Sequence, residues 1–334
     1  MFVVRPAKKQ DSDDIYALAK HLDTLNLPAD QSAIESIIED SLAAFSSKGL
    51  PREREFLFVL EDTSKNQVVG TSMVHAQHGT KREPHVYLRV VRDEHYSDTL
   101  DKYMVHQCLQ IGYNYDGPTE IGGLILKPTF RGHPKKLGKL LSYVRFLYMA
   151  MHRQLFKNRV ISELLPPLEE DGTSKLWKHF GKRFTELPYQ EADKLSKNNK
   201  EFIKSLFPTG LVYTSLFPTD VQNDIGKVGK QTQGVLAMLS KIGFEYANQI
   251  DPFDGGPHYI AKTDKITLVK NACQKPVVIG TPSTNARWTL LASQNPFRAT
   301  SAMVENHDSS LVIDKETSTL LDLKAGDSCW SVVG

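Results

Sequence analysis

The segment from Leu124 to Leu141 constrains the fold more than any other part of the chain. It reads Leu-Ile-Leu-Lys-Pro-Thr-Phe-Arg-Gly-His-Pro-Lys-Lys-Leu-Gly-Lys-Leu-Leu, an apolar strand followed by a basic turn that opens a helix. Backbone N–H groups at a helix start lack intrahelical partners and carry partial positive charge, so they bind phosphate groups. We therefore expect a CoA thioester or a nucleotide here, although a basic helix start is also ordinary solvated surface.

The length of 334 residues predicts two or three domains, because single cores stop growing at about 250 to 300 residues. We expect an acyl-CoA-binding domain over 1–185, a second α/β part completing the substrate site over 186–265, and a β module over 266–334. The 41 Lys and Arg residues nearly balance 39 Asp and Glu, giving a net charge of +2. This balance argues against nucleic acid or an anionic membrane as the main partner.

Cysteine usage and the N-terminus indicate the compartment. Cys108, Cys273 and Cys329 are far apart and lack metal-ligand spacing, so we expect a reducing environment and no metal. The N-terminus lacks the apolar core of a signal peptide, and no uncharged apolar run approaches the roughly 18 residues that a membrane helix needs. We expect a cytoplasmic protein.

Hydrophobic periodicity predicts an α+β fold with a mixed, mostly antiparallel sheet. We expect strands at 55–62, 67–75, 86–91, 121–126 and 158–165. Helices are predicted at 11–25, 33–45, 99–111 and 175–180, and from the basic turn to Met151. Gly181 is expected to end the fourth of these helices, with an aromatic-led strand after it. From about Ile266 short strands predict a small all-β barrel or sandwich, which more often completes an interface than binds a ligand.

Several separated motifs resemble known families. The spacing Lys135-x-x-Gly138-x-Leu140 resembles the CoA-binding signature of GNAT-type acyltransferases, with Leu140 where a small residue is usual. The phrase Phe-Leu-Phe-Val-Leu-Glu-Asp at 56–62, Gly-Lys-Arg-Phe at 181–184 and Ile-Asp-Pro-Phe-Asp-Gly-Gly-Pro at 250–257 resemble the arginine N-succinyltransferase family, in the same order. This resemblance implies a GNAT-like fold and transfer of a succinyl group from succinyl-CoA to the α-amine of arginine.

The resemblance also indicates which residues contact the acyl carrier. In GNAT-type folds the strand before the phosphate turn offers backbone N–H groups to the thioester oxygen. The side chains of that strand also belong to the core, which alone would explain them. We assign the carrier site to Leu124, Ile125, Leu126, Lys135, Lys136, Leu137, Gly138 and Lys139.

One position departs from the family pattern. Where that pattern reads Ile-Gly-x-Val-His-x-x-Thr, with the histidine regarded as the proton-transfer residue, this chain has Gly229. Glycine transfers no proton, so either another base acts, a different amine is the acceptor, or the chain is a catalytically silent subunit that binds CoA or arginine.

Glu163 and His258 are the candidate bases. Glu163 lies in an otherwise apolar strand, where burial would raise its pKa, but it could also be a strand-edge glutamate that faces water. His258 follows directly after the Asp-Gly-Gly-Pro segment. Most of the other histidines, including His85, are better explained by packing or surface exposure.

A cationic acceptor such as arginine needs carboxylates, because the guanidinium pairs with them in a planar, bidentate way. Asp254 and Asp251 are the best candidates, although Asp-Gly-Gly is also a turn-forming sequence. The family and the β module favour a homodimer or another homo-oligomer.

Overall fold

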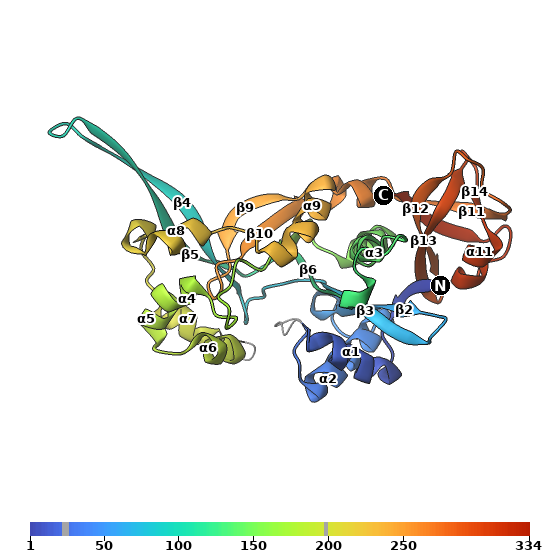
Figure 1. Cartoon of the computed structure of the whole chain (residues 1–334), viewed down its shortest axis with the longest axis horizontal. Helices are drawn as coiled ribbons and strands as arrows, with labels where there is room; N and C mark the ends of the chain where they lie inside the picture. Colours follow the sequence, from blue (N-terminus) through green and yellow to red (C-terminus); the bar gives the residue numbers. More distant parts are fainter. Residues whose placement is uncertain (22–26, 197–199) are drawn as a thin grey trace. The chain divides into compact units, whose positions relative to one another are not determined.

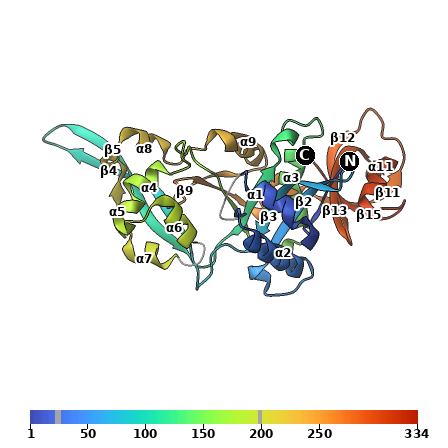
Figure 2. The same cartoon turned by 60° about the horizontal axis from the view of Figure 1, so that its bottom comes forward.

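The computed structural model describes residues 1–21, 27–196 and 200–334, and Figures 1 and 2 show it from two sides. The chain divides into two compact units. Unit 1 comprises 1–77, 119–158 and 262–334, and unit 2 comprises 78–118 and 159–261. Both units draw on segments far apart in sequence, whereas the three ranges expected from sequence follow the chain order. That division stays a prediction.

Unit 1 joins a helix-flanked sheet to the C-terminal β module. Its elements are β1 (Phe2–Pro6), α1 (Ser12–Ala19), α2 (Gln31–Phe45), β2 (Glu55–Asp62), β3 (Gln67–His75), β6 (Thr119–Leu126), α3 (Leu137–Met151), α10 (Thr267–Lys270), β11 (Cys273–Ile279), β12 (Arg287–Gln294), β13 (Phe297–Asn306), β14 (Leu311–Ile313), α11 (Lys315–Leu321) and β15 (Ser328–Val333).

The strand order in unit 1 is β12-β15-β11-β14-β13-β1-β2-β3-β6, and a further pairing of β12 with β13 closes the C-terminal strands into a barrel. The barrel is therefore continuous with the main sheet through β1, whose Val4 pairs with Ala299. In Figure 1, α1 and α2 lie on one side of β2 and β3, and α3 lies on the other. Apolar side chains of α1 and α2, such as Ile15 and Ile38, pack on Leu57 and Val59 of β2.

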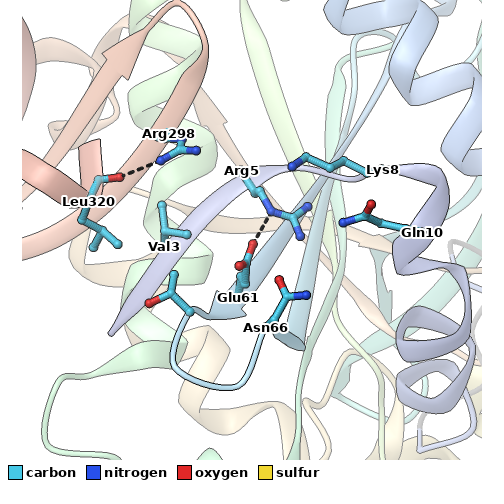
Figure 3. Close-up of a pocket in the computed structure, with 9 residues that line it drawn as sticks. Val3, Arg5, Lys8, Gln10, Glu61, Asn66, Arg298 and Leu320 are labelled. Atoms are coloured by element: carbon cyan, nitrogen blue, oxygen red, sulfur yellow. Dashed lines mark hydrogen bonds and ion pairs between the residues drawn. The ribbon is translucent and has the colours of Figure 1, made fainter. Parts of the chain in front are cut away.

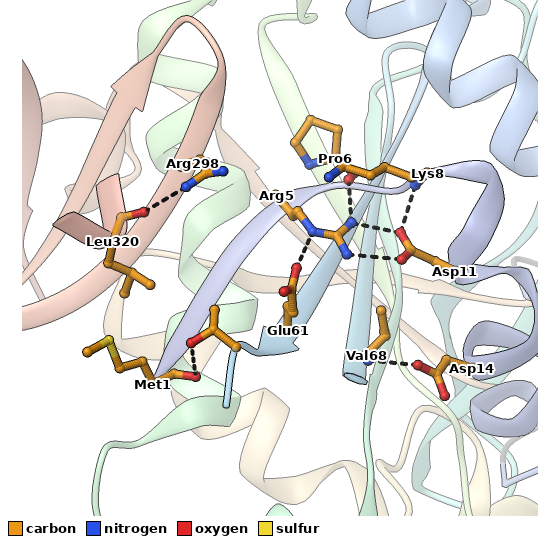
Figure 4. A network of polar contacts seen from close by, with 11 residues as sticks. Met1, Arg5, Pro6, Lys8, Asp11, Asp14, Glu61, Val68, Arg298 and Leu320 are labelled. Atoms are coloured by element: carbon orange, nitrogen blue, oxygen red, sulfur yellow. Dashed lines mark hydrogen bonds and ion pairs between the residues drawn. The ribbon is translucent and has the colours of Figure 1, made fainter. Parts of the chain in front are cut away.

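A cavity of about 120 Å³ lies over β1 in unit 1 (Figure 3). The guanidinium of Arg5 donates hydrogen bonds to both carboxylate oxygens of Asp11, at 2.7 and 2.9 Å, and to Glu61 (Figure 4). These pairs tie β1 to β2 and to the residues that precede α1. None of the predicted site residues belongs to the cavity lining, which consists of Val3, Arg5, Lys8, Gln10, Glu61, Thr63, Asn66, Arg298 and Leu320.

Unit 2 is a sheet in the order β7-β10-β9-β4-β5-β8 with short helices packed on it. Its apolar core is formed by residues such as Leu88, Leu109, Trp177, Phe180 and Phe253. Its elements are β4 (His85–Ser97), β5 (Lys102–Asn114), β7 (Arg159–Glu163), α4 (Lys175–His179), α5 (Gly181–Thr185), α6 (Tyr189–Ser196), α7 (Glu201–Leu206), β8 (Val212–Tyr213), α8 (Thr219–Asp224), α9 (Gln233–Lys241), β9 (Glu245–Ile250) and β10 (Pro257–Lys262).

The helix predicted at 99–111 is wrong. That segment belongs to β5, which pairs with β4 without interruption from Ser97↔Lys102 to His85↔Asn114 and forms the long hairpin of Figure 1. Its short amphipathic pieces suit a helix or a strand equally, and cross-strand pairing decides between them. The strand predicted after Gly181 is also wrong, because residues 181–185 form the helix α5.

The other predicted elements correspond to observed ones with small shifts of their ends. The first predicted helix appears as α1, and its last residues, 22–25, lie outside the described residues. The β-rich C-terminal module also contains α10 and α11, which sequence texture did not indicate. Within the described ranges, no helix is both long and apolar enough to cross a bilayer.

Candidate active site

Unit 1 contains the strand, turn and helix that the sequence assigns to the acyl carrier. The helix α3 begins after Lys136, whose φ of 54° is left-handed and which makes no side-chain cap. Among the described residues, no acceptor binds the backbone N–H of Leu137 or Gly138. Lys135 and Lys136 are exposed beside these amides. The helix start can therefore accept an anion, as its sequence predicts.

The strand β6 has a bulge just before this turn. Its Ile125 pairs with Thr71 of β3, whereas Gly122 pairs with Met73, so β6 contains one extra residue between them. Gly123 lies in this bulge with φ of 55°, and a Cβ there would approach Met73 Cγ to 2.7 Å. Only glycine fits both conditions. The bulge leaves Leu124 outside the regular pairing, whereas Ile125 and Leu126 pair with β3.

Unit 2 brings three histidine side chains together around Glu163, the last residue of β7. His85 Nε2 lies 3.1 Å and His258 Nε2 lies 3.4 Å from the same oxygen, Glu163 Oε1. The two imidazole rings stack with centroids 5.3 Å apart, and the ring of His78 packs edge-on against His85 at 4.5 Å. Both His85 and His258 are buried, while the Glu163 side chain is 28% exposed.

The charges of this cluster follow from its contacts. Burial lowers the pKa of His85, and His78 adds to this effect, so the neutral ring donates its Nε2–H to Glu163. Burial alone would raise the pKa of Glu163, but the positive charge of His258 and the hydrogen bond from His85 outweigh it. The pKa of Glu163 therefore lies well below its usual value, and the rise expected from sequence is wrong.

Asp251 and Asp254 lie on the turn between β9 and β10. Asp251 Oδ1 accepts the backbone N–H groups of Phe253 and Asp254 at 2.7 and 3.0 Å, and Asp254 Oδ1 accepts that of Gly256 at 2.6 Å. In the described residues, Oδ2 of each carboxylate accepts no hydrogen bond. Burial and the nearby charge of Glu163 raise the pKa of Asp251 to about 7, and burial and Asp251 raise the pKa of Asp254.

The donor atoms of this cluster are close together. Those of His78, His85 and Glu163 lie within 4.8 Å of one another, as do those of Glu163, Asp251 and His258. The spacing would admit a cation, and it equally suits the hydrogen-bonded cluster described above, which accounts for it without an ion. The expectation of no metal stays a prediction.

The structure thus brings Glu163, His258 and Asp251 together, and Asp254 lies on the same turn. Neither His85 nor His78 is among the site residues predicted from sequence, since a histidine that alternates with apolar residues in a strand, as His85 does, is usually core. What marks them as part of the site is the carboxylate of Glu163 that faces them, and it is more than 70 residues away in sequence. The catalytic and substrate-binding roles of these residues stay predictions.

Comparison with known proteins identifies the family. The family model described as arginine N-succinyltransferase beta subunit matches residues 2–268. An arginine N-succinyltransferase of Yersinia pestis is 31% identical over 98% of this chain and 96% of its own length. A Pseudomonas aeruginosa protein named arginine N-succinyltransferase subunit beta is 32% identical over 99% of this chain and 97% of its own. The chain belongs to the arginine N-succinyltransferase family.

The solved structure of arginine/ornithine succinyltransferase subunit AI from Pseudomonas aeruginosa matches the whole chain with a TM-score of 0.86 and 27% identity, over 98% of its own length. This match confirms the predicted fold class, a GNAT-like α+β fold with a C-terminal β module. Family membership also confirms the acyl-CoA-dependent N-acyltransferase class and an acyl-CoA co-substrate.

The family's histidine position is closed in this chain. Gly229 donates its N–H to Leu165 O at 2.8 Å. A Cβ on Gly229 would lie 2.5 Å from Pro166 O, a backbone atom, although the φ of −64° suits any residue. The backbone at Pro166 therefore occupies the space where a histidine side chain at position 229 would begin.

We expect Gly229→Ala to lower the free energy of unfolding by about 1–3 kcal/mol, because the added methyl group forces the 165–166 backbone to shift. Chemical denaturation measures this change. The matched control is Gly234→Ala in α9, where a Cβ meets nothing within 4 Å and stability should be unchanged or slightly higher. Equal stabilities of the two variants would contradict the closed backbone.

Proposed function

We propose that this chain transfers the succinyl group of succinyl-CoA to the α-amine of arginine. The cluster around Glu163 carries the proposal, because it offers both a proton acceptor and carboxylates for a cationic amine. The carrier elements belong to unit 1 and the amine-binding groups to unit 2. The names of the family and of the relatives above support this pair of substrates.

The chemistry needs a neutral amine and a polarised thioester carbonyl. An α-ammonium group loses its proton readily near neutral pH, so a modest base suffices. We assign this role to the pair of Glu163 and His258. The partly exposed Glu163 meets the ammonium, and His258 in its neutral form takes up the proton, because the low pKa of Glu163 leaves the carboxylate ionised beside the charged imidazole. The nitrogen then attacks the carbonyl carbon, the C–S bond breaks, and the CoA thiolate takes up the second proton that the nitrogen loses.

The carboxylates of Asp251 and Asp254 bind the guanidinium group of the acceptor arginine. Their Oδ1 atoms are held by backbone N–H groups, which fixes both carboxylates, and Oδ2 of each is left for the substrate. A guanidinium that pairs with these oxygens relieves the repulsion between neighbouring carboxylates and would lower their raised pKa values.

The reaction can be followed by the free thiol formed from succinyl-CoA, and mass spectrometry can identify the acylated product. We expect thiol release that depends on arginine. Thiol release only with other amines would show that arginine is not the acceptor. Thermal stabilisation by CoA without turnover would indicate a catalytically silent binding subunit instead.

We expect Glu163→Gln to lower kcat by about 10²- to 10⁴-fold, the usual contribution of a general base. Glutamine keeps the shape of the side chain but can neither pass the proton on nor stabilise a charged His258. The affinity for CoA, measured by calorimetry, should not change, since Glu163 belongs to the amine site. A Glu163→Gln enzyme with normal kcat would remove the pair from the mechanism.

Arginine binding should strengthen as the pH rises. Asp251 has a pKa of about 7 and is mostly protonated at pH 6 and ionised at pH 8. Because the ionised form attracts the guanidinium, we expect the Kd of arginine to fall by up to about tenfold between these values. Calorimetry with Asp251→Asn should show a flatter profile. The control Asp171→Asn, in an exposed loop where the pKa is already low, should keep the wild-type profile.

Replacing both Lys135 and Lys136 with alanine should weaken CoA binding by about tenfold, because two charge-assisted contacts to the diphosphate are lost. Calorimetry at two salt concentrations checks this, since the difference should shrink as salt rises. The matched control replaces Lys48 and Lys65, two exposed lysines of the same unit, and should bind CoA normally. Unchanged affinity in the first variant would place the diphosphate elsewhere.

A further inference from the structure

The helix α3 contains a buried cation that the proposed mechanism does not use. Arg145 is 2% exposed. Its guanidinium donates hydrogen bonds to Ser142 O and Ser142 Oγ, both at 2.9 Å, and to Gly122 O at 3.4 Å. All of these acceptors are neutral. Across the described part of the chain, no carboxylate forms an ion pair with Arg145.

Such a charge is unfavourable without a counter-ion. Burial lowers the pKa of Arg145 to about 9, and no neighbouring carboxylate offsets this effect. A leucine or methionine would fill the same volume of a helix core without that penalty. A buried charge that packing does not need is a reason to look for a ligand of opposite sign.

The guanidinium also has donors to spare. It carries five N–H groups, and the described contacts use one on each of its three nitrogens. Two N–H groups are left, one on each terminal nitrogen. Two is the number that a carboxylate accepts in a bidentate pair, which is the strongest recognition that arginine offers.

The place of Arg145 identifies the carboxylate. Its contact Gly122 is the residue at which the β6 bulge begins. Leu124, a candidate thioester contact, lies two residues further, about 7 Å along a strand. An acyl group on a thioester held at Leu124 could therefore extend along β6 toward Arg145.

We infer that Arg145 binds the far carboxylate of the succinyl group and thereby selects a dicarboxylic acyl chain over an uncharged one. This inference rests on the proposed function, in which β6 and α3 hold the CoA thioester. Arg145 takes no part in proton transfer, so it determines specificity and does not act as a catalyst. The bulge and the buried cation together explain why the acyl group, and not only CoA, would be recognised.

Calorimetry with succinyl-CoA and butyryl-CoA tests the inference, because these thioesters have the same chain length and differ in the terminal carboxylate. We expect the wild-type protein to bind succinyl-CoA at least about tenfold more tightly. Arg145→Met should bring this ratio close to one while binding of butyryl-CoA and free CoA stays within about twofold. The control Arg52→Met removes an exposed arginine of the same unit and should keep the wild-type ratio.

A wild-type ratio near one would overturn the inference without any variant, which guards against poor folding of Arg145→Met. A wild-type preference that Arg145→Met retains would also overturn it, and so would an equal loss for all three ligands. Each of these results leaves succinyl transfer to arginine intact if thiol release is observed. Absence of binding by every CoA compound would instead reject the carrier site of the proposed function.

Discussion

The contacts of the Glu163 carboxylate are the interaction on which the proposed amine site depends. One of its oxygens faces two buried imidazoles that come from separate strands, β4 and β10. A carboxylate at the end of β7 without these partners would be a desolvated charge, and two buried histidines without it would lose the group that fixes their protonation. Each of the three side chains therefore offsets the cost of burying the other two. Their arrangement also leaves part of the Glu163 side chain exposed, which is where the proposed mechanism brings in the ammonium.

Much of the fold follows from local sequence, because the strand, basic turn and helix at 121–151 carry strong signals at both ends. Prediction from sequence fails where pairing with a distant strand decides whether a segment is a helix or a strand. Residues 102–111 have no intrinsic preference for a strand, yet β5 pairs with β4 over its whole length. Gly181 was expected to stop a helix and start a strand, but the chain turns there into a second short helix that covers the apolar core of unit 2. The closed barrel also depends on the pairing of β15 with β11 and β12, which lie far from it in sequence and which no local pattern specifies.

The candidate site divides in the same way. Glu163, Asp251 and His258 stand out in sequence because each is polar within an apolar or glycine-rich context. That they meet could not be predicted, since residues 163 and 258 are brought together only by the pairing of β7 with β10. Nor could sequence give the sign of the shift at Glu163, because the sign depends on the charge of a partner. The absence of the family histidine at Gly229 is visible in sequence, but its meaning is steric and needs the backbone of Pro166.

Each unit holds buried ionisable groups whose charged form burial disfavours, and the signs of these charges are opposite. Arg145 in unit 1 is buried against neutral acceptors, and Asp251 and Asp254 in unit 2 keep raised pKa values on a turn that fixes one oxygen of each. Folding alone would favour neutral side chains at these places. A substrate pair made of an anionic acyl chain and a cationic amine would supply the missing counter-charge to both, and neither an uncharged thioester nor a neutral amine would do so. If the proposed roles of these residues hold, the electrostatic penalty in the free protein becomes selectivity on binding, because only ligands of the right sign relieve it.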